Sequence, residues 1–467
     1  MKFTSTRGHA EAESLEAILR GLAPDGGLYV PSSMPGVRYC AAECRTLAEA
    51  ERFALGAFFD DVPVAVRDAA IANLLAKFPK DDPVPLRGVG AFHVLELFHG
   101  PTGAFKDVAL SVLPVLLKAA AGERRVLVLT ATSGDTGSAA MAGFAGVPGV
   151  EVEVFFPNVG TSRVQRLQMT TPSERNVFAV AIRGNFDDAQ AAVKRIFADE
   201  SVRAEASAAG VTLSSANSIN AGRLVPQVAY YLMAASRLAP ASFDVVVPSG
   251  NFGNILAAYY ARLLGAPVRR LVCASNVNDV LARFVKTGVY DPGDKFTVTN
   301  SPSMDIRKSS NVERLLWLLN GGFDDPERAA AETKRLMDDF AAHGRYELSA
   351  AAMELLSRDF VSGVATPEET EDEMRRTREE TGYVLDPHTA VALRVARDLG
   401  FPREGAPCVV AATATPYKFP ETCMRAFGEN VLSNPPPAFR SLESAPVTQK
   451  QVVDVAGIDD AVRARWR

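Results

Sequence analysis

Short apolar runs alternate with segments of helical periodicity along the middle of the chain, and this alternation predicts a parallel sheet system. The segment 187–199, for example, has the spacing of an amphipathic helix. Strands that alternate with helices are typical of α/β proteins, in which helices cover both faces of the sheet. The apolar runs expected to be strands are 126–129, 150–156, 177–182, 244–247, 270–274 and 408–412.

The ends of the chain and one internal segment depart from this alternation. The first 90 or so residues have mostly helical patterns with turns marked by Gly and Pro, which favours a separate small domain. From Ser310 to about Glu380 the sequence is charged and helix-like, so we expect an insertion there rather than sheet. After Pro435 we expect a loosely attached arm. The predicted domains are residues 1–90, an α/β lobe at 91–235 and a second α/β lobe at 236–467 that carries the insertion at about 310–380.

One lysine stands where a predicted strand passes into a predicted helix. Residues 92–98 have a strand pattern and 108–117 an apolar helical one, with a turn forced by Gly100-Pro101 between them. Lys106 should therefore enter the helix close to the interior, where burial lowers the pKa of an amine and lets it attack a carbonyl. An enzyme that holds pyridoxal phosphate as a Schiff base needs such a lysine. A surface lysine with a partly covered stem is the plain alternative.

A glycine-containing loop with the sequence Pro-Ser-Gly-Asn-Phe-Gly-Asn occupies residues 248–254, between a predicted strand and a predicted helix at 255–264. Such a turn presents free backbone N–H groups to one point, with the helix dipole behind them. Gly250 and Gly253 would let that backbone close on an anion. The loop has neither the Lys-Ser/Thr of a P-loop nor Gly-x-Gly-x-x-Gly, and a loop that only makes the turn is the alternative.

A second loop of the same build, residues 130–138, follows the predicted strand at 126–129. Its hydroxyl and N–H groups suit another anion, such as a substrate carboxylate or phosphate. Asp135 is acidic and cannot hold an anion, so we expect it to shape the loop by hydrogen bonds. Two anion loops and a candidate Schiff-base lysine favour a pyridoxal phosphate enzyme over a nucleotide-binding protein.

Segments spread along nearly the whole chain resemble the threonine synthase family, in the longer form of many bacteria and fungi. The resemblance implies pyridoxal phosphate fold type II, similar to the tryptophan synthase β chain, with two open parallel-sheet lobes and a small N-terminal domain. It also implies conversion of O-phospho-L-homoserine and water to L-threonine and phosphate. The similar segments are 3–7, 21–31, 97–107, 131–138, 217–223, 248–253, 276–279 and 386–388.

The same resemblance assigns roles to single residues. Lys106 is the expected Schiff-base lysine, and Thr413 is expected to place a neutral hydroxyl beside the pyridine nitrogen, which leaves that nitrogen less protonated. Arg223 can bind a phosphate or carboxylate with two donors, although a structural salt bridge is an alternative for it. The expected contacts of the cofactor phosphate are Gly250, Asn251, Phe252 and Asn254. The expected substrate contacts are Thr132, Ser133, Thr136, Ser218, Asn220 and Arg223.

The chain departs from the family pattern at two positions. Thr415 stands where the family usually has the histidine of Thr-Ala-His-Pro, so no role is carried over to that side chain. Gly103 stands where relatives often have a larger residue. Neither change affects the roles expected of Lys106 and Thr413.

Composition limits the class of protein. The 467 residues are 47% apolar and 22% charged, and the net charge of −5 includes no basic run suited to nucleic acid or anionic membrane. No apolar stretch approaches a membrane span and the N-terminus lacks a signal-peptide core, so we expect a soluble, cytoplasmic protein. Five scattered cysteines and five histidines show no metal-ligand spacing, which predicts reduced thiols and no metal. We expect a small-molecule substrate and a monomer or homodimer.

Two alternatives to threonine synthase stay open. A related pyridoxal phosphate dehydratase or phospholyase, acting on a hydroxy or phospho amino acid by β-elimination, would share the lysine and the phosphate loop. A non-catalytic homologue that only binds pyridoxal phosphate is the other, and the intact Lys106 and substrate loops count against it.

Overall fold

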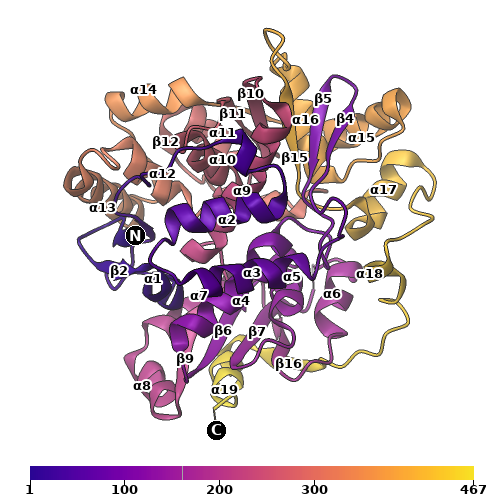
Figure 1. Ribbon diagram of the computed structural model, residues 1–467. Helices are drawn as coiled ribbons and strands as arrows, with labels where there is room; N and C mark the ends of the chain where they lie inside the picture. Colours follow the sequence, from indigo (N-terminus) through magenta and orange to yellow (C-terminus); the bar gives the residue numbers. More distant parts are fainter. Residues whose placement is uncertain (160, 467) are drawn as a thin grey trace.

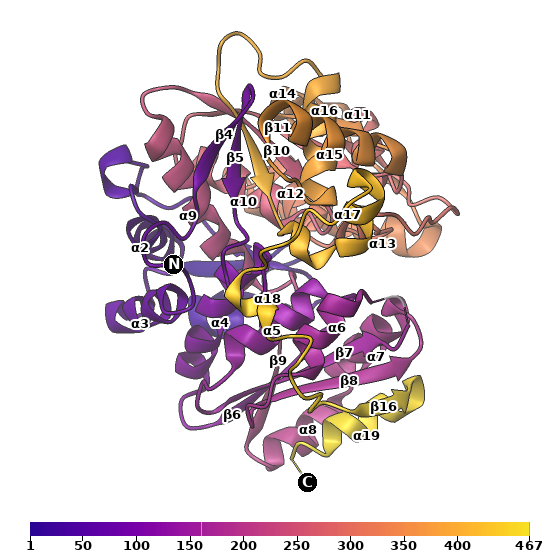
Figure 2. The same ribbon diagram turned by 90° about the vertical axis from the view of Figure 1, so that its right-hand side faces the viewer.

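The computed structural model describes residues 1–159 and 161–466, and two large sheets divide most of the chain into two α/β lobes (Figure 2). The first sheet has five strands in the order β16-β8-β7-β6-β9, and every neighbouring pair is parallel. In that order, the strands are Gln451–Asp454, Val177–Arg183, Val150–Pro157, Arg125–Ala131 and Val211–Ser215.

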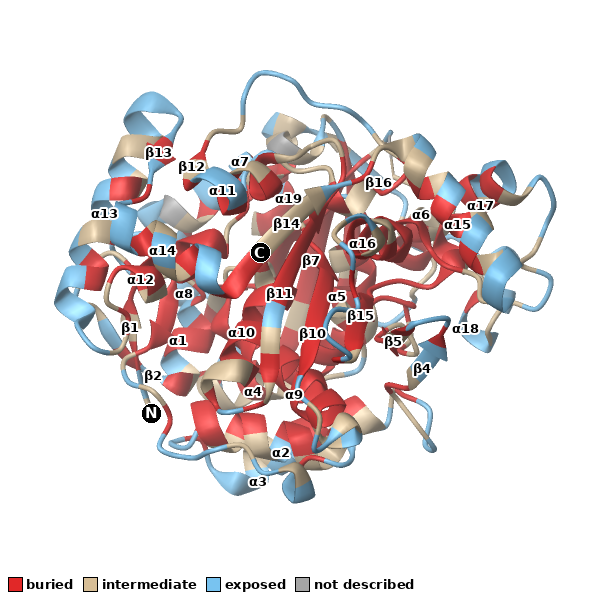
Figure 3. Cartoon of the chain, turned by 90° about the horizontal axis from the view of Figure 1, so that it is seen from above, coloured by how far each residue is buried: buried red, intermediate tan, exposed pale blue. Residues whose placement is uncertain are grey.

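The second sheet has six strands in the order β14-β11-β10-β15-β5-β4, parallel except for the antiparallel pair of β4 and β5. The strands are Phe360–Val364, Val268–Ser275, Phe243–Pro248, Cys408–Ala412, Phe92–Glu96 and Leu86–Val89. Every residue of β10 and β15 is buried, as expected of central parallel strands covered on both faces (Figure 3). The predicted α/β fold with two parallel-sheet lobes is confirmed.

Helices cover both sheets, and one of them lies at the centre of the molecule. Helix α9 is buried along most of its length and packs against α2, α4 and α10, so it joins the N-terminal region to both lobes. The helices of the first lobe are α4 (Lys106–Ala121), α5 (Asp135–Phe144), α6 (Arg163–Thr170), α7 (Phe186–Ala198), α8 (Glu200–Ala208), α9 (Ala221–Leu238) and α19 (Ile458–Arg463). Those around the second sheet are α10 (Gly253–Leu263), α11 (Val280–Thr287), α15 (Pro367–Thr381), α16 (Pro387–Asp398) and α17 (Pro420–Phe427).

The N-terminal region contains a small sheet as well as the expected helices. Its three short antiparallel strands lie in the order β2-β1-β3, with bounds Glu11–Glu13, Lys2–Ser5 and Tyr29–Pro31. Helices α2 and α3 lie in front of α9 and α4 in Figure 1. The helices that complete this region are α1 (Ser14–Arg20), α2 (Leu47–Phe58) and α3 (Val64–Leu75). The sequence pattern did not predict the small sheet, because its strands are only three or four residues long.

The segment after Ser310 is mainly helical, but the expectation that it contains no sheet is wrong. Residues 360–364 form β14, which pairs in parallel with β11 at the edge of the second sheet. The sequence Phe-Val-Ser-Gly-Val has no continuous apolar run, because an edge strand needs to bury only part of its surface. The helices of this segment are α12 (Val312–Leu319), α13 (Pro326–His343) and α14 (Ala350–Asp359), beside the small β12–β13 pair (Val289–Tyr290 and Tyr346–Glu347).

The C-terminal segment is not the loosely attached arm that its sequence predicts. After α17 the chain passes along both lobes through the short α18 (Pro437–Arg440) and joins the first sheet as β16 (Figure 2). Helix α19 then buries Ile458, Ala461 and Val462 in that lobe. Each sheet thus contains strands from distant parts of the chain, and the domain limits at residues 90 and 235 stay a prediction.

Candidate active site

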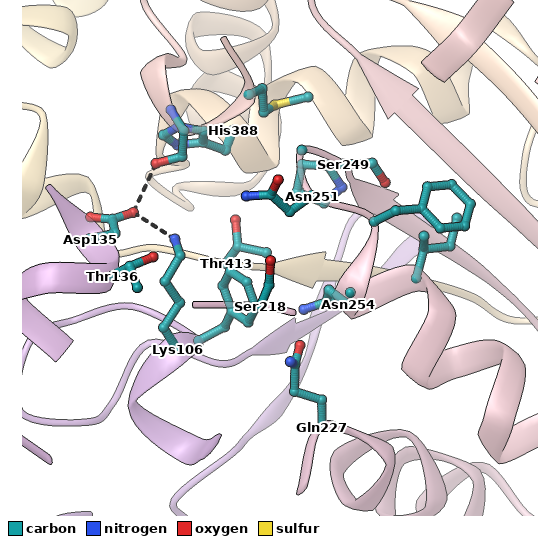
Figure 4. A pocket seen from close by; sticks show the side chains of 18 of the residues that line it. Lys106, Asp135, Thr136, Ser218, Gln227, Ser249, Asn251, Asn254, His388 and Thr413 are labelled. Carbon is teal, nitrogen blue, oxygen red and sulfur yellow. Dashed lines mark hydrogen bonds and ion pairs between the residues drawn. The ribbon is translucent and has the colours of Figure 1, made fainter. Parts of the chain in front are cut away.

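The predicted site segments all follow the carboxyl ends of parallel strands, where open α/β sheets bind their ligands. The loop before α4 follows β5, residues 132–134 follow β6, residues 216–220 follow β9, residues 249–252 follow β10, and Thr413 follows β15. Residues from four of these five segments, all but 132–134, line one cavity (Figure 4). The cavity contains about 750 Å³ of empty space, its opening included. Residues Asp135 and Thr136 of α5, directly after residues 132–134, also line it.

Lys106 is the first residue of α4 and points into this cavity (Figure 4). The backbone before it is held in place because Phe105 N–H donates to the Thr413 carbonyl at 2.9 Å. The Lys106 side chain is 14% exposed, and its Nζ lies 3.3 Å from Asp135 Oδ2. Burial lowers the pKa of Lys106, against the opposite effect of the Asp135 charge, as expected for a lysine at this position.

The glycine loop after β10 ends in a backbone turn that directs the first N–H groups of α10 toward the cavity. Phe252 has a left-handed backbone with φ of 63°, and Gly253 begins the helix. Two loop carbonyls are held from outside the loop: Ser309 Oγ donates to Gly250 O at 2.8 Å and Asn311 Nδ2 to Asn251 O at 2.9 Å. Because the first N–H groups of a helix have no acceptor within it, they are available to an anion.

The cavity wall also contains a buried donor without a partner, which suits a phosphate-bearing cofactor. Asn254 Oδ1 accepts a hydrogen bond from the Tyr231 hydroxyl, whereas Asn254 Nδ2 is buried with no partner. A buried amide donor left in this state costs free energy unless a ligand accepts from it. With Lys106 across the cavity and Thr413 between them, the residues present fit pyridoxal phosphate (Figure 4).

Three of the predicted substrate contacts line the same cavity: Thr136, Ser218 and Arg223. Arg223 is 3% exposed, its Nη1 donates to the Ala216 carbonyl, and its Nε has no partner. Burial lowers the pKa of Arg223 to about 10, so it stays a cation at neutral pH. Among the side chains that the structure describes, no carboxylate forms an ion pair with Arg223, which disfavours the structural salt bridge considered for it.

The other three predicted substrate contacts do not line the cavity. Thr132 Oγ1 accepts from Gly134 N–H at 2.9 Å and from Gly137 N–H at 3.0 Å, so it shapes the loop. Asn220 caps α9, and its Nδ2 donates to the backbone carbonyls of Ile18 and Ser215. The polar atoms of both side chains are therefore hydrogen-bonded within the protein, and substrate contact by them is not supported. Ser133, in the same loop as Thr132, is exposed.

Several cavity residues carry no role in the sequence-based prediction. Gln227 of α9 and His388 of α16 line the wall, and His388 Nδ1 lies 2.9 Å from Asp386 Oδ1. Ser303 donates from its N–H to His388 Nε2 at 3.1 Å and from its Oγ to Asp135 Oδ2 at 2.9 Å. The Asp-Pro-His motif at 386–388 was a usable signal for His388, but nothing in the pattern around Ser303 marks it.

Asp135 is more than the loop-shaping residue that the sequence predicts. Its carboxylate lies between Lys106 and Lys418 and also accepts from Gln165 Nε2 at 2.8 Å. Burial alone would raise the pKa of Asp135, but the charges of Lys418 and Lys106 hold it well below the usual range. A permanently ionised carboxylate therefore lies beside the candidate Schiff-base lysine.

The described residues contain neither a metal-binding cluster nor a membrane-spanning helix. No cluster of three or more His, Cys, Asp or Glu side chains among them is arranged to hold a metal ion. None of the helices formed by residues 1–159 and 161–466 combines the length and the apolar character needed to cross a membrane.

Comparison with known proteins identifies the family. Residues 84–358 match the model described as pyridoxal-phosphate dependent enzyme, 2–52 match threonine synthase N terminus, and 389–462 match threonine synthase, C-terminal. The threonine synthase of Pseudomonas aeruginosa is 40% identical over 438 residues, covering 91% of this chain and 90% of that protein.

Solved structures of two threonine synthases are similar to this chain over nearly its whole length. The pyridoxal phosphate-bound threonine synthase from Brucella melitensis has a TM-score of 0.91 and 36% identity, covering 100% of both chains. Yeast threonine synthase has a TM-score of 0.90 and 31% identity, covering 99% of this chain and 98% of that one. The cavity that unites Lys106, the glycine loop and Arg223 is thus found in a chain that belongs to the threonine synthase family of pyridoxal phosphate-dependent enzymes.

Proposed function

We propose that the protein converts O-phospho-L-homoserine and water into L-threonine and inorganic phosphate. The observation that carries this proposal is a single cavity containing Lys106, an N–H-rich loop and the buried, unpaired cation Arg223. A substrate with a phosphate and a carboxylate brings anionic groups of the kind that a guanidinium binds through paired N–H donors. The family to which the chain belongs supports the same reaction.

The cofactor would be held at three places in the cavity. Lys106 would hold its aldehyde carbon, the loop of Gly250, Asn251 and Phe252 with Asn254 its phosphate, and Thr413 would lie at its ring nitrogen. When bound, pyridoxal phosphate supplies an electron sink that stabilises negative charge on the substrate carbons next to the amine.

Side chains of the protein bind the substrate and transfer its protons. The Lys106 amine, once free, removes and returns protons at Cα and Cβ of the substrate, because its lowered pKa keeps part of it neutral. Arg223, with Ser218 and Thr136, binds the substrate anions and keeps the leaving phosphate aligned. Asp135 lies 3.3 Å from Lys106 Nζ, close enough to orient the amine between these transfers.

The direct test is release of phosphate with formation of threonine from O-phospho-L-homoserine, set against O-phosphothreonine and serine. Stoichiometric threonine and phosphate from the first substrate alone are expected. A keto acid and ammonia from serine or O-phosphothreonine would instead identify a β-eliminating lyase, and no product from any substrate would identify a binding homologue. Either result would refute the proposal.

Substitution of Arg223 tests its role in substrate binding with the same assay. Arg223→Met should lower kcat/KM for O-phospho-L-homoserine by about 10- to 100-fold, the range for hydrogen bonds to a charged group. Arg237→Met is the matched control, since Arg237 is on the same helix but pairs with Asp82 away from the cavity. Equal kinetics of the two variants would remove Arg223 from substrate binding.

The compartment and the oligomeric state belong to this proposal as well. We infer an enzyme of the reducing cytoplasm, because all five cysteines are free thiols and four of them are buried. Sedimentation would distinguish the monomer and homodimer expected from the sequence.

A further inference from the structure

A second lysine, Lys418, lies directly behind the cavity and is 0% exposed. It ends the turn Pro416–Lys418, a few residues after Thr413. Its Nζ donates to the Thr102 carbonyl at 3.0 Å and lies 2.9 Å from Asp135 Oδ1. Because burying an ammonium group without a counter-ion is very unfavourable, Asp135 is the group that makes this position possible.

The Asp135 carboxylate is shared unequally between the two lysines. Its Oδ1 accepts from Lys418 and from Gln165, at 2.9 and 2.8 Å. Its Oδ2 accepts from Ser303 at 2.9 Å and from Lys106 at the longer distance of 3.3 Å. The pair with Lys418 is therefore both shorter and more deeply buried than the pair with Lys106, whose side chain is 14% exposed.

We propose that Lys418 is a positioning residue that keeps the Lys106 amine neutral by acting as the counter-ion of Asp135. Without Lys418, Asp135 would have Lys106 as its nearest cation and would hold the proton on it. With Lys418 in place, a protonated Lys106 would be the second cation beside one carboxylate, which favours loss of its proton. The inference rests on the proposed function to the extent that it assigns Lys106 as the reactive amine.

Other charged groups around Lys106 favour the same state. Arg223 lines the cavity as a further cation, and its charge and that of Lys418 add to the effect of burial in lowering the pKa of Lys106, against Asp135. Asp107, the next residue of α4, has its carboxylate bonded to the hydroxyl and N–H of Thr102, and burial raises its pKa. His388 also lines the cavity and is held by Asp386.

The test measures the titration of Lys106 without relying on turnover. The cofactor is removed, the protein is treated with cyanate over a range of pH, and carbamylation of the peptide that contains Lys106 is followed by mass spectrometry. Since cyanate reacts with the neutral amine, the midpoint of the rate profile reports the pKa of Lys106. We expect Lys418→Met to move this midpoint upward by about one pH unit or more, which is a tenfold loss of neutral amine below the midpoint. Lys418→Gln should do the same while keeping a donor.

Two controls separate charge from structure. Lys418→Arg keeps the cation, so its midpoint should stay with the wild type even if its melting temperature changes. Asp135→Asn should lower the midpoint, and adding Lys418→Met to it should raise the midpoint less than Lys418→Met does alone, because the carboxylate that held the proton is gone and only the repulsion by the Lys418 charge is lost.

An unchanged midpoint in both Lys418→Met and Lys418→Gln would overturn the inference, as would an upward shift of the same size in the Asp135→Asn background. Because lysine titration is measured in the cofactor-free protein, this result is independent of whether threonine is the product.

Discussion

A methyl group added at Gly250 tests the glycine loop more sharply than one added at Gly253. A Cβ at Gly250 would lie 2.8 Å from the carbonyl oxygen of Ser303, well inside ordinary contact. A Cβ at Gly253 would meet its nearest atom, Asn311 Nδ2, at 3.4 Å, where ordinary contact begins. The two variants add the same group to the same loop and differ in whether there is room for it.

Neither side of the Gly250 contact can move freely. Gly250 O accepts from Ser309, and Ser303 is held by His388 and Asp135. Overpacking of this kind costs about 1–3 kcal/mol. If the loop moves to relieve the conflict, its N–H groups turn away from the phosphate, and Gly250→Ala should weaken pyridoxal phosphate binding by about 5- to 150-fold. Gly253→Ala should stay within about threefold of the wild type.

The assay is titration of the cofactor-free protein with pyridoxal phosphate, followed by the absorbance of the bound cofactor, together with thermal unfolding without cofactor. A glycine that serves only the turn would lower the melting temperature of the cofactor-free protein and leave the cofactor affinity unchanged. That outcome for Gly250→Ala, or equal losses of affinity in the two variants, would refute a phosphate-binding role for the loop.

Three further outcomes are expected. Lys106→Ala should abolish covalent trapping of the cofactor by borohydride and lower turnover by orders of magnitude; trapping on another lysine would contradict the assignment. In heavy water, the threonine formed should carry deuterium at Cα and in its methyl group, since both carbons gain a proton during the reaction; threonine without methyl deuterium would exclude the proposed chemistry. Glu51 is 0% exposed with neither carboxylate oxygen bonded, and burial raises its pKa well above the usual range. The folded protein therefore keeps a proton there that the unfolded chain releases above about pH 4.5, so unfolding becomes easier as pH rises. Glu51→Leu should raise the melting temperature more at pH 8 than at pH 5, and an equal gain at both would contradict this.

Features encoded within a few neighbouring residues were predictable from the sequence. The apolar runs of the central strands, such as 244–247, report burial on both faces, and the loops that follow them must lie at the carboxyl edge of a parallel sheet. For this reason the sequence alone could group Lys106, Thr136, Ser218 and Arg223 in one site. In the structure, all four line the same cavity.

Features that depend on pairing between distant segments were not predictable in the same way. The edge strands β14 and β16 have weak patterns because they gain stability from a neighbour rather than from their own burial. Ser303 and Lys418 are separated from Asp135 by long stretches of chain, and only the packing of the second lobe against the first brings them together. Glycine at 103 and threonine at 415 are explained by the fold as well: a Cβ at Gly103 would lie 2.5 Å from Thr415 Cγ2.

The charge balance of the cavity depends on these contacts between distant segments of the chain. Arg223 lines the cavity as a cation, Asp135 as an anion and Lys106 as the reactive amine. If Asp135 were paired with Lys106 alone, the carboxylate would hold the proton on Lys106, and its negative charge would weaken the attraction of the cavity for anions. Because Lys418 approaches from behind the cavity wall, Asp135 is neutralised from the protein side, and the cavity side stays positive for phosphate groups. The protein can therefore attract anions into the cavity and still present a neutral amine there, two demands that a single lysine–aspartate pair cannot satisfy together.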